Sequence, residues 1–455
     1  MKIANIIDEN IFRGYDIRGI YNDNLTIDVA YTIGLAFGTK LKKENKKETV
    51  IGYDNRESSP ALFKALAQGI TKTGINVINL GLVTTPMYYY ALGLFQASSG
   101  IMITGSHNPK EYNGFKMTFN GIYNAYGEYI QEFKQLVLKK EFVTGQGQIR
   151  EERIEERYLK HVTDSINLGP YKRKIVVDCG NGTPSIIIEK VLQSLNIDYI
   201  PLYCESNPDY PNHHPDPSVQ KNLVDLQQKV IETKADAGFA YDGDGDRVGL
   251  VNDLGKPMGA DHFMIIIIRD LVNKLDDKRF LYDVKCSKAL EDEICKLGGT
   301  PICYRTGNSY MRAKVIEDNI KFAGELSGHI FFNDKFNGFD DGIYASLRMI
   351  EILTHTPKTV SELLEGINQY YSTEELKIKV PDDIKFKKIE TVKKYCQEKN
   401  YNILTIDGCK VLFDDGFALI RASNTGPNIT MRFEATTKER LTEIQTEFEN
   451  LLKTI

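Results

Sequence analysis

The segment AYDGDGDRVGLV carries three aspartates that alternate with glycines. Asp242, Asp244 and Asp246 come directly after an apolar stretch, and their alternation places the three carboxylates on one side of an extended turn. Carboxylates this close together repel one another strongly unless a cation lies between them. Because oxygen ligands suit hard cations, we predict a site for magnesium, manganese or calcium rather than zinc at this turn.

Two other interpretations of this turn stay open. A calcium loop of the EF-hand type would use the same aspartates, and Asp253 falls at its twelfth position. Its sixth position needs glycine, however, and is Arg247 here, and the preceding pattern is that of a strand rather than a helix. The other interpretation is an acidic turn that is simply solvated.

A hydroxyl stands at the end of another apolar strand, in GIMITGSHNPKEYNGFKMTF. Ser106 lies there between Gly105 and His107, which is a suitable setting for an exposed nucleophile. The alternative is an ordinary turn, since Ser-x-Asn-Pro segments commonly form one. A hydrolase triad is disfavoured because the sequence has no Gly-x-Ser-x-Gly elbow here.

Polar side chains occupy alternate positions in FAGELSGHIFF. Glu325, Ser327 and His329 could present an acceptor, a hydroxyl and an imidazole to one polyhydroxylated ligand. The pattern fits equally well a strand face with a hydrogen-bonded histidine in the core.

The segment LIRASNTGPNITMRFE places one guanidinium beside several small polar groups. Arg421 is followed by Ser423, Asn424 and Thr425 before the next strand. A guanidinium, hydroxyls and backbone N–H groups together form a nest for a phosphate dianion, and the alternative is a plain hairpin turn. Nucleotide binding lacks support, because the sequence contains no Walker motif.

Three segments of the chain share one order of elements: a short apolar strand, a polar turn with an aspartate, a helix, a break and a second apolar strand. They are TVIGYDNRESSPALFKALAQGITKTGINVINL, KIVVDCGNGTPSIIIEKVLQSLNIDYIPLY and RFLYDVKCSKALEDEICKLGGTPICY. Their turn aspartates, Asp54, Asp178 and Asp283, are 124 and 105 residues apart, which is the spacing of domains rather than of solenoid repeats. Strand, helix and strand in this order form the right-handed unit of a parallel or mixed sheet, so we predict three related α/β domains.

The pattern changes after residue 368, where short strands follow one another quickly before the amphipathic TTKERLTEIQTEFENLLKTI. Strands joined by short turns and closed by a helix indicate a small α+β domain. We therefore predict three α/β domains with mixed sheets over residues 1–148, 149–252 and 253–367, and a distinct C-terminal α+β domain over residues 368–455.

Composition narrows the class of protein further. The 455 residues include 42% hydrophobic and 26% charged ones, as in globular proteins, and the net charge of −5 argues against a nucleic-acid surface. The longest apolar run, residues 263–268, is far shorter than the roughly 20 residues of a membrane span. Asp8 and Glu9 stand where a signal peptide would be apolar, so we expect a cytoplasmic protein without a membrane partner. The seven cysteines form no metal-binding pattern and are expected to stay reduced.

In their order along the chain, several motifs resemble those of the α-D-phosphohexomutase family, and most closely its bifunctional phosphomannomutase/phosphoglucomutase branch. They are FRGYDIRG, TGSHNPKEYNGFK, DCGNGTPS, DGDGDR, GNSYM, GELSGH, DDGIYAS and RASNTGPNITMRFE. The resemblance covers nearly the whole chain. It implies four domains around one central cleft and a mutase that moves a phosphoryl group between two hydroxyls of a hexose.

The resemblance also implies roles for single residues. Ser106 would be the phosphoserine and would hold magnesium together with the three aspartates, while Arg247 would steady the same phosphoryl group. The acid and the base would come from His107, Lys116 and His329. The residues that would face the substrate are Tyr15, Arg18, Lys285, Asn308, Glu325, Ser327, Arg421, Ser423, Asn424 and Thr425.

Two positions depart from the family's motifs. Gly105 stands where the family usually has alanine, and it is expected to loosen the serine loop slightly. Asn308 stands where many members have histidine, and its amide can hydrogen-bond a ligand but cannot carry charge.

One bound phosphate cannot reach both ends of a hexose, so the implied reaction uses a carrier. Phospho-Ser106 gives its group to the free hydroxyl, a hexose 1,6-bisphosphate turns over in the cleft, and the other phosphate returns to Ser106. The implied partners are small sugar phosphates, with magnesium as cofactor and a hexose 1,6-bisphosphate as activator.

Two alternatives are kept beside this function. The nearest is phosphoglucosamine mutase, whose C-terminal loop usually reads Ser-Gly-Thr-Glu-Pro, against Ser-Asn-Thr-Gly-Pro here. The other is a sugar-phosphate binding protein without chemistry, which would be expected to lack Ser106 or one of the aspartates. The sequence leaves the preferred hexose and the oligomeric state open.

Overall fold

The computed structural model describes residues 1–121, 123–423, 426 and 428–455. Within these residues the strands form four sheets, three of them mixed and the last antiparallel. The fold class predicted from the sequence is therefore confirmed.

The first domain holds a seven-stranded sheet. Its elements are η1 (Glu9–Ile11), β1 (Ile17–Ile20), α1 (Ile27–Lys43), β2 (Glu48–Tyr53), α2 (Ser59–Thr71), β3 (Asn76–Leu82), α3 (Thr85–Leu94), β4 (Gly100–Ile103), β5 (Tyr112–Asn120), β6 (Tyr123–Asn124), α4 (Glu128–Lys139) and β7 (Ile149–Glu151). The strand order is β1-β5-β4-β2-β3-β7, with β6 paired to β5.

The second and third domains hold sheets of five and four strands. The second contains α5 (Glu155–Asp164), β8 (Lys174–Asp178), η2 (Thr183–Ile186), α6 (Ile188–Ser194), β9 (Asp198–Leu202), η3 (Gln220–Leu223), α7 (Val224–Thr233), β10 (Ala237–Tyr241), β11 (Val248–Asn252) and β12 (Pro257–Met258). The third contains α8 (Ala260–Leu271), β13 (Arg279–Asp283), α9 (Lys288–Lys296), β14 (Thr300–Tyr304), α10 (Asn308–Glu317), β15 (Phe322–Gly324), β16 (Ile330–Phe332), α11 (Gly342–Thr354) and α12 (Val360–Leu363). Because β12 pairs with β11, the second sheet extends past the expected boundary at residue 252, and the domain limits stay predictions.

These three sheets contain the same four-strand unit. The first strand of each unit lies between the second and the third, both parallel to it, and the fourth runs antiparallel to the third: β3-β2-β4-β5, β9-β8-β10-β11 and β14-β13-β15-β16. Asp54, Asp178 and Asp283 all stand at or directly after the end of the first strand. The aspartate turns in the sequence therefore mark equivalent positions of a repeated domain.

The central strands of the repeated unit are apolar because helices cover both faces of these sheets. In β10 and in β4 every residue is buried. The helices begin where the sequence offers caps: Thr84 accepts a hydrogen bond from the N–H of Met87 at the start of α3, and Pro86 lies in the first turn of that helix. The rigid ends of these strands carry the loops that form the site.

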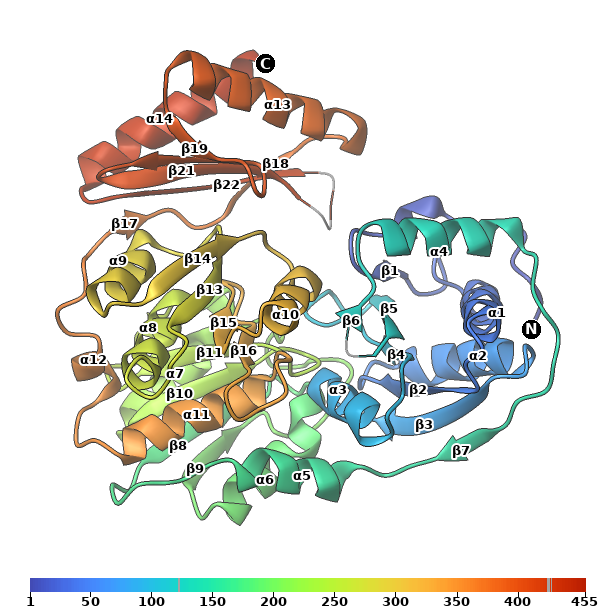
Figure 1. Ribbon diagram of the computed structural model, residues 1–455. Coiled ribbons are helices and arrows are strands. Elements are labelled where there is room, and N and C mark those ends of the chain that lie inside the picture. The colour runs from blue at the N-terminus through green and yellow to red at the C-terminus, as the bar shows by residue number, and fades with distance from the viewer. Residues whose placement is uncertain (122, 424–425, 427) are drawn as a thin grey trace.

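The C-terminal domain is an antiparallel sheet with two helices on one face (Figure 1). It contains β17 (Tyr371–Ser372), β18 (Leu376–Lys379), α13 (Asp382–Glu398), β19 (Asn402–Leu404), β20 (Cys409–Phe413), β21 (Gly416–Ala422), β22 (Asn428–Ala435) and α14 (Lys438–Thr454). Along β22, Ile429, Met431 and Phe433 belong to the core of this domain. Thr430, Arg432 and Glu434 alternate with them and line the large cleft of the protein, as the two-residue period of a strand requires.

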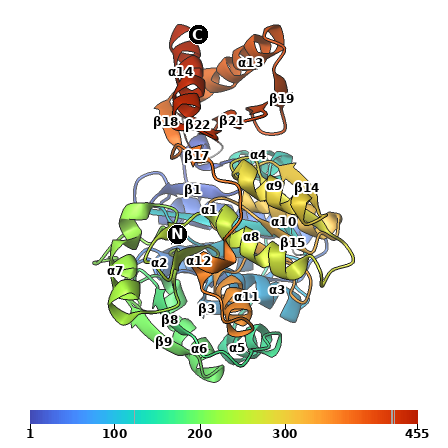
Figure 2. The same cartoon turned by 90° about the vertical axis from the view of Figure 1, so that its left-hand side faces the viewer.

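The four domains differ in how they share their apolar cores. One cluster of buried side chains includes residues of the first three domains, from Val50 to Ile367. The core of the C-terminal domain, from Val380 to Leu452, is a separate cluster. Figures 1 and 2 show this domain standing apart above the others, connected through the segment that carries β17.

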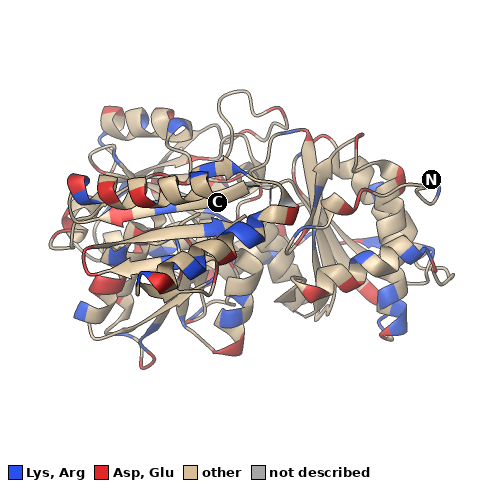
Figure 3. Ribbon diagram, turned by 90° about the horizontal axis from the view of Figure 1, so that it is seen from above, with Lys and Arg blue, Asp and Glu red and all other residues tan. Residues whose placement is uncertain are grey.

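The surface carries both signs of charge. Figure 3 shows Lys and Arg interspersed with Asp and Glu along the helices of the C-terminal domain. Among the described helices, none combines the length and the apolar character needed to cross a membrane.

Candidate active site

The loops that follow the third strand of each repeated unit meet at one cleft. Ser106 follows β4, Asp242 follows β10 and Glu325 follows β15. The cleft has a volume of about 830 Å³ and is lined by residues of all four domains. The repeat thus supplies three equivalent loops with three different sets of side chains.

Ser106 is held in an unusual backbone conformation at the end of β4. Its φ of +48° lies in the left-handed region, which costs a residue other than glycine of order 1–3 kcal/mol. Its hydroxyl donates to Asp242 Oδ2 at 2.9 Å and lies 3.2 Å from His107 Nδ1. The N–H of Ser106 donates to Thr104 Oγ1 at 2.8 Å. The predicted nucleophile therefore contacts the predicted metal loop directly.

Arg56 holds the serine loop through hydrogen bonds to its backbone carbonyl groups. Its guanidinium donates to the carbonyl oxygens of Ser106, Asn108, Pro109 and Tyr112 at 2.8, 2.6, 2.6 and 2.9 Å. The side chain is 1% exposed and pairs with Asp54, which also accepts from the N–H of Gly105. Sequence reasoning missed this role, although Asp54 belongs to the repeated turn.

Gly105 makes room for this arginine. A Cβ at position 105 would lie 2.2 Å from Arg56 Cζ, so Arg56 would have to move to admit a side chain there. The glycine therefore allows the loop to close on the guanidinium, and its expected loosening of the loop stays a prediction.

We predict that Gly105→Ala displaces Arg56 and weakens both folding and turnover. Overpacking of this kind costs about 1–3 kcal/mol, which denaturant unfolding would measure. Gly93→Ala is the matched control, since a Cβ there meets nothing within 4 Å. If Gly105→Ala is as stable and as active as wild type, the clamp has no role in holding Ser106.

The three aspartates of the predicted metal turn lie together and are fully buried. One carboxylate oxygen from each of Asp242, Asp244 and Asp246 lies within 4.8 Å of the others. Lys116 Nζ contacts Asp244 Oδ2 at 2.8 Å and Asp246 Oδ2 at 2.5 Å. The Oδ1 atoms of both aspartates are buried and have no hydrogen-bond partner among the described residues. Buried oxygens without partners beside an acceptor-only cluster fit a hard divalent cation.

The pKa values of the ionisable groups at this turn also fit a site for a cation. Burial and the neighbouring Asp244 and Asp246 raise the pKa of Asp242 well above its usual value. Burial opposes the charge of Lys116, but Asp244 and Asp246 raise its pKa well above the usual value.

Asp253, the twelfth position of the EF-hand interpretation, accepts hydrogen bonds from the N–H and the hydroxyl of Ser361.

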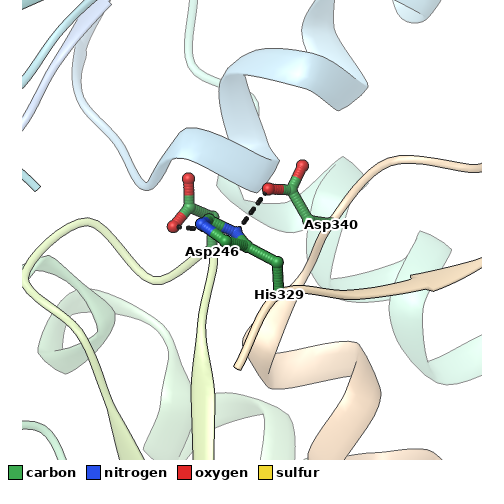
Figure 4. Close-up of side chains that lie close together, drawn as sticks. All are labelled: Asp246, His329 and Asp340. Atoms are coloured by element: carbon green, nitrogen blue, oxygen red, sulfur yellow. Dashed lines mark ion pairs between the residues drawn. The ribbon is translucent and has the colours of Figure 1, made fainter. Parts of the chain in front are cut away.

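His329 lies beside two carboxylates, those of Asp246 and Asp340 (Figure 4). Its Nδ1 lies 2.7 Å from Asp340 Oδ2 and 3.6 Å from Asp246 Oδ1. Arg247 Nε donates to its Nε2 at 2.9 Å. Asn308, expected to face the substrate, lines the cleft but donates its amide to Asp340 at 3.2 Å. Asp340, the first residue of the DDGIYAS motif, is therefore part of the site, although the motif alone predicted no role for it.

The adjacent carboxyl groups of Asp340 and Asp341 have pKa values that are shifted in opposite directions. Burial raises the pKa of Asp341 to about 7, and this group caps α11 and accepts from Tyr158. Burial acts on Asp340 as well, but His329, Lys116 and Arg312 lower its pKa below the usual value. Asp340 is therefore kept as an anion facing His329.

The expected substrate-facing residues of the first three domains also line the cleft. Tyr15 is half-buried, and its partial removal from water together with Asp16 raises its pKa to about 12. Arg18 pairs with Asp16 at 2.5 Å, and Lys285 Nζ lies 3.6 Å from Glu375. Glu325 accepts from the N–H of Gly307 at 2.5 Å.

The predicted phosphate nest lies on the C-terminal domain. Arg421 and Ser423 line the cleft, and both side chains are mostly buried. Asn424 and Thr425 lie outside the described residues. The cleft-lining residues among our candidates are Tyr15, Arg18, Ser106, His107, Lys116, Arg247, Lys285, Asn308, Glu325, Ser327, His329, Arg421 and Ser423.

The segment PNHHPDP contributes contacts that sequence reasoning also missed. His214 Nε2 contacts the carbonyl of His107, and Asp216 lines the cleft. His213 pairs with the turn aspartate Asp178 at 2.9 Å. The only signal was a polar, proline-rich run in a long connection without regular elements.

Comparison with known proteins bears on this cleft. Models of four successive domains, described as phosphoglucomutase/phosphomannomutase, match the chain in order: domain I over residues 9–144, domain II over 156–255, domain III over 259–370 and the C-terminal domain over 375–451. The chain belongs to the phosphoglucomutase/phosphomannomutase family. The family resemblance seen in the motifs is thereby confirmed.

Relatives of the phosphoglucomutase/phosphomannomutase family match over nearly their full length. The phosphomannomutase/phosphoglucomutase of Pseudomonas aeruginosa is 40% identical, covering 99% of this chain and 97% of the relative. The phosphoglucomutase of Neisseria meningitidis serogroup A is 40% identical over 99% of this chain and 98% of its own. The crystal structure of a family protein from Burkholderia thailandensis superposes with a TM-score of 0.92 at 36% identity, covering 99% and 98% of the two chains.

Proposed function

We propose that this chain is a hexose-phosphate mutase that interconverts hexose 1-phosphate and hexose 6-phosphate through a phosphoserine. The observation that carries the proposal is the hydrogen bond from Ser106 Oγ to Asp242 in a cleft lined by all four domains. This contact places a hydroxyl nucleophile directly on a buried acidic site, which is the pairing that phosphoryl transfer needs.

The transfer step is a displacement at phosphorus. The free hydroxyl oxygen of the sugar forms a bond to the phosphorus of phospho-Ser106, and the bond from phosphorus to Ser106 Oγ breaks. The proton of the attacking hydroxyl passes to a base, and Ser106 Oγ gains a proton from an acid. His107, Lys116 and His329 are the proposed acid and base groups, because all three line the cleft around Ser106.

We propose Mg²⁺ as the ion held by Asp242, Asp244 and Asp246 together with the phosphorylated Ser106. When bound, it neutralises charge that develops on the phosphoryl oxygens. Arg247 steadies the same phosphoryl group in this proposal, since its Nε lies 3.9 Å from Asp242 Oδ2 and donates to His329 Nε2.

The bisphosphate formed in the first step must turn over before the second. A cleft of about 830 Å³ with a separate cationic nest on the C-terminal domain suits a ligand that is held by one phosphate while the other reacts. We propose that Arg421, Ser423, Asn424 and Thr425 hold the phosphate that is not reacting. Lys285, Asn308, Glu325, Ser327, Tyr15 and Arg18 face the sugar and its phosphates in this proposal.

The preferred hexose in this proposal is mannose, glucose or both, because the Pseudomonas and Neisseria relatives carry these sugars in their names. A hexose 1,6-bisphosphate serves as activator by phosphorylating Ser106, and we place the enzyme in the cytoplasm. N-Acetylphosphoglucosamine mutase of Aspergillus fumigatus shares the fold with a TM-score of 0.60 at 15% identity. That likeness extends to the fold alone.

The proposal is tested by assaying the purified chain with mannose, glucose and glucosamine 1-phosphates and catalytic glucose 1,6-bisphosphate. We expect turnover of one or both of the first two sugars and little of the third. Preference for glucosamine 1-phosphate would favour the phosphoglucosamine mutase alternative. Tight binding of sugar phosphates without any turnover would favour the non-catalytic alternative.

Arg421→Ala tests the placement of the distal phosphate. A charged hydrogen-bonded contact is worth about 1.5–3 kcal/mol, so kcat/KM should fall roughly 10- to 150-fold. The loss should be similar for mannose and glucose 1-phosphates, because one nest serves both orientations. Poorer exclusion of water should also raise phosphate release per mutase turnover.

Arg440→Ala is the matched control for this change. Arg440 pairs with Asp415 at 3.1 Å on the same domain and is 33% exposed. Normal binding and turnover by Arg421→Ala would show that the C-terminal loop is only a hairpin turn.

A further inference from the structure

The carboxylate of Asp407 joins the predicted phosphate nest to the Thr306–Asn308 loop of the third domain. Asp407 Oδ2 accepts from Arg421 Nε at 3.0 Å, and Arg421 Nη2 lies 3.4 Å from Asp407 Oδ1. The same Oδ2 accepts from the backbone N–H of Thr306 at 3.0 Å. Thr306 lies between β14 and α10, two residues before Asn308.

The turn that carries Asp407 is fixed by close packing. Gly408 has a φ of +81°, and a Cβ there would lie 2.4 Å from the carbonyl oxygen of Ile420 on β21. Ile406 packs beside a small apolar cluster formed by Val284, Phe417 and Leu419. The carboxylate is thus presented from a rigid turn between β19 and β20 rather than from a loose loop.

Contact through two nitrogens on one edge of the guanidinium fixes its plane. Pairing through Nε and Nη2 holds Arg421 side-on against Asp407, which restricts a side chain that otherwise has many rotamers. Arg421 lines the cleft, whereas Asp407 is absent from the described residues that line it. Asp407 can therefore act on a ligand only through Arg421 and Thr306.

The contact of Asp407 with Thr306 leads on to residues that are expected to face the sugar. Thr306 Oγ1 donates to the turn aspartate Asp283 at 2.9 Å, and Asp283 lies 3.8 Å from Lys285 Nζ. The next residue, Gly307, donates its N–H to Glu325. A movement of Asp407 would therefore reach both the phosphate nest and the residues expected to face the sugar.

We propose that Asp407 is a positioning residue, which orients Arg421 for the substrate phosphate and sets the C-terminal domain against the Thr306–Asn308 loop. This inference rests on the proposed role of Arg421 in holding the distal phosphate. An ordinary surface ion pair would have neither effect, because such pairs contribute little and are not coupled to ligand contacts.

The test compares Asp407→Ala, Asp407→Asn, Arg421→Ala and the double variant Asp407→Ala/Arg421→Ala. We expect Asp407→Ala to raise KM for glucose 1-phosphate about tenfold and to change kcat less than about threefold, because the ordered guanidinium contributes to binding. Asp407→Asn keeps an acceptor for Thr306 and should fall between Asp407→Ala and wild type. The double variant should lose less than the sum of the two single losses in free energy, because part of the effect of Asp407 is transmitted by that arginine.

Asp415→Ala is the matched control, since it removes the partner of Arg440 on the same domain. It should leave KM and kcat unchanged. Additive losses in the double variant, or an unchanged KM in both Asp407 variants, would overturn the inference. Asp407→Asn preserves shape, so the inference stays testable even if Asp407→Ala folds poorly.

Calorimetric binding of glucose 6-phosphate separates this inference from the proposed function. If wild type binds this ligand but turns over no hexose phosphate, the proposed function fails, and weaker binding by the Asp407 variants still supports the inference. If wild type is an active mutase and the Asp407 variants bind as wild type does, the inference alone fails.

Discussion

Ser106→Ala is expected to lower mutase turnover by at least about a thousandfold, because the variant has no oxygen to carry the phosphoryl group. Alanine keeps a Cβ at the same φ of +48°, so both residues bear the same backbone cost and the comparison isolates the hydroxyl. Intact mass and peptide mapping of wild type should find one phosphate on Ser106. The same measurement on the variant should find none.

Ser194→Ala is the control for this change, since that serine lies at the end of α6, away from the cleft, and its hydroxyl donates to the carbonyl of Val191. Full turnover by Ser106→Ala, with wild-type enzyme that carries no phosphate at Ser106, would falsify the carrier mechanism. A variant that binds glucose 6-phosphate normally but does not turn over is the result that the mechanism requires.

Asp244→Asn is expected to lower turnover by about 100-fold or more and to raise the magnesium concentration that supports half-maximal activity. Asp244 is fully buried and accepts from Lys116, Thr85 and Thr104 in addition to its place in the acidic cluster. Wild type treated with chelator should lose activity and regain it when excess magnesium is added. Magnesium titration of both proteins, followed by activity, measures the shift.

Asp253→Asn separates the two interpretations of the acidic turn. Asp253 would be a ligand in an EF-hand loop, but its Oδ1 accepts from the N–H and the hydroxyl of Ser361, an acceptor that asparagine retains. The magnesium dependence of the Asp253→Asn variant should equal that of wild type. Unchanged activity of wild type in excess chelator would remove the metal site from the mechanism altogether.

The repeated domain could be predicted from the sequence because its signal is local. An apolar strand followed at once by an aspartate turn recurs at Asp54, Asp178 and Asp283, and each copy folds into the same strand order. The alternating aspartates at 242, 244 and 246 are local in the same sense, and spacing alone brings them within 4.8 Å of one another.

Contacts between distant parts of the chain could not be predicted in this way. Arg56 reaches the serine loop some 50 residues along the chain, and Asp407 reaches Thr306 over 101 residues. No spacing rule links such pairs, because the sheet order and the packing of whole domains bring them together. Gly105 illustrates the limit, since its role depends on an arginine that lies far from it in sequence.

The division of the apolar cores has a consequence for how the molecule unfolds. One cluster of buried side chains runs through the first three domains, although the first domain also has a second core of its own, from Ala4 to Val137. Loss of packing in the shared cluster exposes apolar surface in all three domains, so they are expected to melt together. The C-terminal domain keeps its own core and contacts the rest through a small apolar cluster of Val284, Phe417 and Leu419 and through polar contacts such as those of Asp407 and Glu434. Because this contact is small, the C-terminal domain is expected to lose its structure at a lower free-energy cost than the other three domains.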